Sequence, residues 1–145
     1  MFVKSQPAEA PRNRGALIAS LALAGILVGM LVAQLYSFEE FVIGGLGGLF
    51  AVLIIAAEFF ALPFLLRMRL SPAFRWLSLV SLIGTVVVWG VVTLRALTSA
   101  ITLESLPFFG DVLTLDVGAE SLLFVAGLFI LTVWAVWGLW PVRKR

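Results

Sequence analysis

Four long runs of apolar residues, separated by short polar stretches, dominate the pattern along the chain. The first run, from Gly15 to Tyr36, has 22 residues and carries no charge. About 20 apolar residues are enough for a helix to cross the roughly 30 Å hydrocarbon core of a bilayer. The pattern therefore predicts an all-α polytopic membrane protein with four transmembrane helices in an up-down bundle, at residues 15–36, 44–66, 72–94 and 121–140.

The stretches between the runs give the expected organisation. Residues 1–14 hold two prolines and three basic residues, which is typical of a short cytoplasmic tail without fixed structure. Ser71 and Pro72 form a helix start, because serine caps free N–H groups and proline at the first helical position loses no hydrogen bond. Residues 95–120 hold four acids among apolar pairs, so we expect an outer loop with a short helix or hairpin. Residues 141–145 form a basic cytoplasmic end.

A secretory signal peptide is the competing interpretation of the first run, because basic residues precede it. The run is longer than the apolar core of such peptides, which reaches about 15 residues, and no A-x-A pattern ends it. We therefore expect an uncleaved first helix. The two halves of the chain share no alignable pattern, so the sequence gives no support to a transporter built from inverted repeats.

The basic residues predict the orientation of the spans. Nine of the ten lie in the tail, in the link after the second span and in the C-terminal end, all on one side of the membrane. By the positive-inside rule this side is cytoplasmic, so we expect a multi-pass protein of the cell membrane with both termini in the cytoplasm. Six of these residues form a rim that we expect to attract anionic lipid headgroups: Arg67, Arg69, Arg75, Arg143, Lys144 and Arg145.

Composition excludes several kinds of chemistry. The chain is 62% hydrophobic with a mean hydropathy of +1.14, so its main partner is expected to be the lipid bilayer. It has no cysteine and no histidine, which excludes disulfides, thiolate metal sites and haem ligation by imidazole. We predict no metal, no cofactor and no nucleic-acid partner, because membrane topology explains the basic clusters.

One carboxylate, Glu58, lies inside the second apolar run. It precedes Leu66 by eight residues, which at about 1.5 Å per residue places it about 12 Å deep, near the bilayer midplane. An ionised acid costs on the order of 3 kcal/mol there, so we expect Glu58 to face other helices and to favour its protonated form. The neighbours expected from depth are the hydroxyls of Ser81, Thr85 and Thr132.

Two interpretations of Glu58 remain open. Either it forms hydrogen bonds that hold helices together, worth about 1 kcal/mol, or it carries a proton or contacts a ligand in a polar pocket. Pro63 adds a contact, because it cannot donate to the carbonyl of Phe59 and so bends the helix or frees an acceptor one turn from Glu58. Trp89 is expected to face lipid or to pack in the core, rather than to line a pocket for a flat ligand.

Small residues predict close helix contacts. Gly25 and Gly29 have GxxxG spacing, and Ala57 and Ala61 place a similar stripe on the second span. Packing inside the chain is favoured over packing against a second copy, because four helices must bury some surface. Gln34, near the outer end of the first span, is expected to reach interfacial water.

The outer segment 95–120 is longer than a connector requires. We expect it to lie on the bilayer surface. The alternatives are that it covers a cavity between the helices, or that it presents Phe108 and Phe109 to the interface or to a partner.

The glutamate of the second span, Glu58, and the sequence ALPFLLRMRLSP from Ala61 to Pro72 resemble the DoxX/MauE-like superfamily of small four-helix membrane proteins. The resemblance covers at most the first three spans. Some members of that superfamily are linked to quinol oxidation or to the maturation of redox enzymes, but this chain lacks any cysteine that thiol chemistry requires.

We therefore expect a protein that is not an enzyme, but a subunit or assembly factor with a membrane-protein partner, or a homo-oligomer. The alternative is a small proton-coupled transporter that uses Glu58. Such a protein would be similar to the small multidrug resistance transporters, which also have four spans and depend on one embedded glutamate. Those transporters carry it in their first helix, whereas Glu58 lies in the second.

Overall fold

The computed structural model describes residues 11, 13–39, 47–98, 105–110 and 112–140. The described chain contains four helices and one two-stranded antiparallel sheet. All four helices are long and apolar enough to cross a membrane, which confirms the predicted all-α membrane fold. The elements are α1 (Arg14–Tyr36), α3 (Gly48–Leu65), α4 (Pro72–Leu97), β1 (Ser105–Phe109), β2 (Leu113–Asp116) and α5 (Ala119–Leu139).

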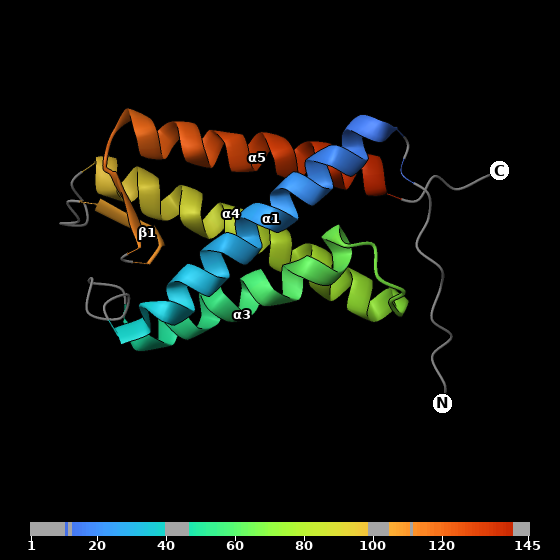
Figure 1. Ribbon diagram of the computed structural model, residues 1–145, viewed down its shortest axis with the longest axis horizontal. Helices are drawn as coiled ribbons and strands as arrows, with labels where there is room; N and C mark the ends of the chain where they lie inside the picture. Colours follow the sequence, from blue (N-terminus) through green and yellow to red (C-terminus); the bar gives the residue numbers. More distant parts are fainter. Residues whose placement is uncertain (1–10, 12, 40–46, 99–104, 111, 141–145) are drawn as a thin grey trace.

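The helices form an up-down bundle in which each packs on its neighbour in the chain and α5 closes the ring against α1 (Figure 1). The hairpin of β1 and β2 lies at one end, which we name the hairpin end. The connection between α3 and α4 lies at the opposite end, the link end, together with the start of α1 and the end of α5. The first residues predicted for the second span, 44–46, lie outside the described residues. So do both ends of the chain, including Arg143, Lys144 and Arg145.

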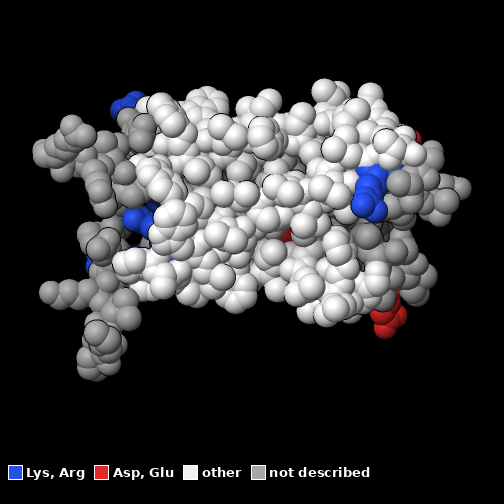
Figure 2. All heavy atoms as spheres, turned by 180° about the vertical axis from the view of Figure 1, so that it is seen from behind, with Lys and Arg blue, Asp and Glu red and all other residues white. Residues whose placement is uncertain are grey.

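The surface between the two ends is a wide belt of apolar side chains. Charged groups gather at the ends of the bundle and leave the middle of this face almost without charge (Figure 2). Large hydrophobic residues stand exposed on every helix, with Ile18 67% and Leu123 74% accessible. Lipid is the solvent that makes such exposure favourable, so the protein is a multi-pass membrane protein.

Helices α1 and α5 approach each other closely at glycines other than the ones that the GxxxG pattern indicated. A Cβ on Gly138 would overlap the methyl group of Ala16, and one on Gly15 would lie 2.8 Å from the ring of Trp134. Gly25 is exposed, and no atom lies within 4 Å of the Cβ position there. The preferred internal packing of Gly25 is therefore wrong.

The other small residues have mixed environments. Gly29 faces the ring of Phe109, with 3.6 Å between the Cβ position and that ring. Ala61 is fully buried in the bundle and Ala57 is half-buried. Ala61 thus lies inside the bundle, as a packing role requires, whereas the α1 stripe contacts no other helix at Gly25.

Ser78 of α4 bridges an open pair of backbone groups in α3, one residue beyond the pair that Pro63 affects. The hydroxyl of Ser78 donates to the carbonyl of Phe60 at 2.6 Å and accepts from the N–H of Phe64 at 3.0 Å. It thus stands between two backbone groups that normally bond each other in a helix. The prediction concerned the Phe59 carbonyl, whereas the opened pair lies one residue further along, at Phe60 and Phe64, and a side chain of the neighbouring helix satisfies it.

Replacing Ser78 with alanine is expected to lower the free energy of unfolding by about 1–2 kcal/mol, because two buried backbone groups lose their partner. Denaturation by SDS in mixed micelles measures the change. Ser81→Ala, three residues further along α4 and only half-buried, is the matched control and is expected to change stability by less than about 0.5 kcal/mol. Equal losses in the two variants would contradict the role given to Ser78.

The link between α3 and α4 is a tight helix end. Arg67 has a φ of 55°, its N–H donates to the carbonyl of Phe64, and the N–H of Met68 donates to the carbonyl of Pro63. These two bonds form a Schellman motif, in which a left-handed residue ends the helix. The predicted cap of the next helix is confirmed, because the Ser71 hydroxyl accepts from the N–H of Phe74 at 3.3 Å.

Candidate functional site

Glu58 lies at the centre of the candidate site. Its side chain is completely buried, and it is the one ionisable residue that is fully buried in the described part of the chain. α3 presents it towards α1 and α4, which supply its hydrogen-bond partners. The expectation that this acid faces other helices is confirmed.

Two neutral donors share one oxygen of the carboxyl group. Nε2 of Gln34 donates to Oε1 of Glu58 at 3.2 Å, and Nε1 of Trp89 donates to the same oxygen at 3.1 Å. Both donor side chains are fully buried. The carboxyl group thereby connects α1, α3 and α4 through one atom.

These partners differ from the ones that depth predicted. Ser81 is only half-buried, and the buried hydroxyls of Thr85 and Thr132 have no hydrogen-bond partner among the described residues. Gln34 does not face interfacial water, so that expectation is wrong. Trp89 packs in the core, one of its two expected environments, but its indole N–H also bonds Glu58, which the sequence analysis did not predict.

The partners of Glu58 differ from the predicted ones because side chains on a helix lean along the helix axis. A side chain in an α-helix tilts towards the N-terminus of its own helix. α3 runs away from the hairpin end, so Glu58 leans towards that end. α1 and α4 run in the opposite direction, so Gln34 and Trp89 lean towards the link end and meet it. A match of Cα depth with Glu58 selects Thr85 instead. The side chain of Thr85 leans towards the link end, away from the carboxyl group of Glu58.

The hairpin supplies the fourth side of the site. The backbone carbonyl of Phe108 accepts from Nε2 of Gln34 at 2.8 Å. The Phe108 ring is fully buried, with its centroid 4.7 Å from that of Trp89 and 4.8 Å from that of Phe124. Phe108 therefore enters the bundle between α4 and α5, so this residue does not lie on the bilayer surface as expected for the segment. Of the alternatives, the structure supports the one in which the segment covers the space between the helices.

The turn of the hairpin sits against the end of α1. Gly110 has a φ of +58°, and a Cβ there would overlap the Ser37 hydroxyl and lie 3.0 Å from the carbonyl oxygen of Ala33. Phe109 packs on Phe124 with 5.6 Å between ring centroids. A residue with a side chain would be both strained and crowded at Gly110. Glycine therefore allows the hairpin to approach Gln34.

Two buried oxygens of the site have no partner among the described residues: Oε2 of Glu58 and Oε1 of Gln34. These oxygens belong to the Glu58 carboxyl group and the Gln34 amide, which the hydrogen bond from Nε2 of Gln34 to Oε1 of Glu58 already joins. A carbonyl and an ionised carboxylate only accept hydrogen bonds, so the site offers two acceptors beyond those already used. The described residues contain no cluster of three metal-ligating side chains.

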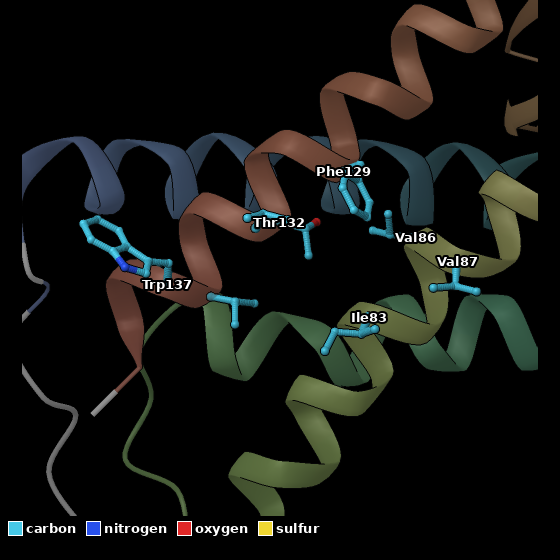
Figure 3. A pocket seen from close by; sticks show the side chains of 8 residues that line it. Ile83, Val86, Val87, Phe129, Thr132 and Trp137 are labelled. Atoms are coloured by element: carbon cyan, nitrogen blue, oxygen red, sulfur yellow. The ribbon is translucent and has the colours of Figure 1, made fainter. Parts of the chain in front are cut away.

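A separate hollow of about 380 Å³ opens between α4 and α5. Ile83, Val86 and Val87 of α4 face Phe129, Thr132 and Trp137 of α5 across it (Figure 3). Its lining is apolar apart from the hydroxyl of Thr132 and the indole N–H of Trp137. Such a lining fits a lipid acyl chain and offers little to orient a polar ligand.

Comparison of the chain with models of protein families, with curated proteins and with solved structures finds no match. The function is therefore inferred from the geometry of the bundle. Polar residues at two positions of the apolar runs, Glu58 and Gln34, were the sequence signal for the site. The contribution of the Phe108 carbonyl had no signal in the sequence, because any residue supplies a carbonyl.

Proposed function

We propose that this protein is a non-enzymatic accessory subunit of a larger membrane protein, with the link end in the cytoplasm. The observation that carries the proposal is the open face of α1 at Gly25. Among the described residues, the fully buried acid Glu58 is engaged in bonds between helices, which suits a structural role. The similarity to DoxX/MauE-like proteins agrees with this proposal and remains a prediction.

The open face follows one side of α1. Exposed residues recur there at alternating steps of four and three, the spacing of one helix face: Ile18, Ala22, Gly25, Gly29 and Val32. The small residues in its middle lower the surface between larger ones at its ends. Transmembrane helices associate through such small residues, because their backbones can approach closely and gain van der Waals contact. The partner that fits is a transmembrane helix with its own small residues.

The open face borders the hairpin. Phe109 lies against Gly29 and the Gly110 turn lies against the end of α1. A helix docked at Gly25 would therefore meet the hairpin at one end of its contact. Contacts of the partner helix with both the open face of α1 and the hairpin would explain why the outer segment is longer than a connector needs.

Replacing Gly25 with leucine is expected to abolish co-purification of the partner in mild detergent, because the side chain fills the space that the partner helix would occupy. The matched control is Gly127→Leu on α5, where the Cβ position also meets nothing within 4 Å. The control is expected to retain the partner, which mass spectrometry of the purified complex identifies. Recovery of copies of this chain alone from both the wild type and the control would contradict the proposal and indicate a homo-oligomer.

A small proton-coupled transporter is the second candidate function, favoured by the unpartnered Oε2 of Glu58. Its test is proton-linked uptake in vesicles that contain the purified protein. Loss of uptake in Glu58→Gln, with uptake present in the wild type, would support transport and contradict the accessory role.

A further inference from the structure

The two unpartnered oxygens beneath the hairpin have one economical explanation. Buried polar atoms of native proteins nearly always have a hydrogen-bond partner, so each exception requires a reason. Glu58 Oε2 and Gln34 Oε1 are both buried, both without a partner, and both belong to groups joined by the bond from Nε2 to Oε1. A single proton placed between them would satisfy both atoms.

The orientation of the Gln34 amide follows from the hairpin. The Phe108 carbonyl can only accept a hydrogen bond, so the amide nitrogen must point towards it. The 2.8 Å contact uses one N–H, and the 3.2 Å contact with Oε1 of Glu58 uses the other. The amide oxygen is then available for a donor, and an ionised Glu58 has none to give.

We infer that Glu58 and Gln34 form a cyclic pair of a carboxylic acid and an amide, and that this pair is a binding site for one proton. In the pair, Nε2 of Gln34 donates to Oε1 of Glu58, and the protonated Oε2 of Glu58 donates to Oε1 of Gln34. Trp89 adds a second donor to Oε1 of Glu58. The pair thus uses every polar atom of the carboxyl and amide groups.

Among the described residues, no charged group competes with this arrangement. Both hydrogen-bond donors that reach Glu58 among the described residues are neutral. The elements packed against Glu58 carry four other titratable residues, all in the first or last turn of their helices: Arg14 and Tyr36 on α1, and Arg75 and Arg95 on α4. β1 contributes none. A proton is therefore the positive charge available at this depth.

The hairpin decides how the proton reaches water. Phe108 fills the hairpin end of the bundle above the pair, against Trp89 and Phe124. The same Gln34 amide that holds the acid also holds the Phe108 backbone. Exchange of the proton with water on this side is therefore expected to be faster when the hairpin leaves its place. This inference concerns the interior of the bundle and is independent of what docks at Gly25.

Infrared spectroscopy of the purified protein in lipid vesicles tests the inference. Glutamate labelled with ¹³C at the side-chain carboxyl identifies the glutamate bands, and Glu58→Gln assigns the band of position 58. The wild type is expected to show a protonated carboxyl band at neutral pH, shifted in D₂O and absent from Glu58→Gln. Glutamine is the matched replacement, because its amide can occupy the same cyclic pair.

The exchange rate in a hairpin variant and the carboxylate bands of the wild type complete the test of the proton site. Gly110→Val, which forces the hairpin turn from α1, is expected to speed deuterium exchange of this band at least tenfold. If the labelled wild type shows only carboxylate bands at neutral pH, the inference is overturned, and a water donating to both oxygens of an ionised pair replaces it. The wild-type spectrum gives this answer even if a variant fails to fold.

Discussion

Replacing Trp89 with alanine is expected to lower the free energy of unfolding by about 3–5 kcal/mol, the typical cost of truncating a large buried aromatic side chain. Trp89 is fully buried, and its ring centroid lies 4.7 Å from that of Phe108. Its indole N–H donates to Glu58. The substitution removes a large volume from the core and one donor from the acid. The hairpin also loses the surface against which Phe108 packs.

SDS titration in mixed micelles measures the loss, and two variants divide it into its parts. Trp89→Phe keeps an aromatic ring and removes the N–H, so it is expected to cost about 1–2 kcal/mol. Trp76→Ala makes the same change on the same helix at a side chain that is 57% exposed, and is expected to cost less than about 1.5 kcal/mol. Equal losses for Trp89→Ala and Trp76→Ala would show that the core around Glu58 contributes little to stability.

The sequence predicted the helices well because a membrane leaves few alternatives. A span must be long, apolar and satisfied in its own backbone hydrogen bonds, so runs such as the one from Gly15 to Tyr36 have one outcome. α1 begins at Arg14 and ends at Tyr36, in agreement with that run. The Ser71 cap of α4 was also predictable, because it depends on neighbouring residues alone.

The contacts between helices were less predictable, because they depend on rotation and lean. Depth places Thr85 beside Glu58, whereas the opposite lean of side chains on antiparallel helices brings Gln34 and Trp89 there. The GxxxG pattern identifies small residues but not the direction they face. Gly25 faces outwards, whereas the close contact of α1 with α5 uses Gly138, which belongs to no such pattern.

The position of the hairpin was also difficult to predict from the local sequence. The acids in residues 95–120 predict a loop with a short helix or hairpin, and the described residues of this segment do form the hairpin of β1 and β2. The burial of Phe108 depends on the space that four packed helices leave at one end, which no local pattern records. Gln34 looked like an interfacial residue because its partners, Glu58 and the Phe108 carbonyl, lie 24 and 74 residues away in the chain.

The contact of α1 with α5 gives the second large expected effect. Gly138→Leu is expected to lower the free energy of unfolding by about 3 kcal/mol, the upper part of the usual cost of overfilling a packed contact. Even the first carbon of the new side chain would overlap the Ala16 methyl group and lie 3.3 Å from the Ala16 Cα. A methyl group and a backbone atom cannot rotate away, so the two helices must separate.

Gly127→Leu is the matched control, because it makes the same change on the same helix at a position that meets nothing within 4 Å. There the loss of a flexible glycine from a helix favours folding by about 0.5–1 kcal/mol. The two variants are therefore expected to shift the SDS midpoint in opposite directions. Ala16→Gly combined with Gly138→Leu removes the blocking methyl group and is expected to recover part of the loss. A Gly138→Leu variant as stable as the wild type would mean that α1 and α5 do not meet at this point, and that α5 does not close the bundle as described.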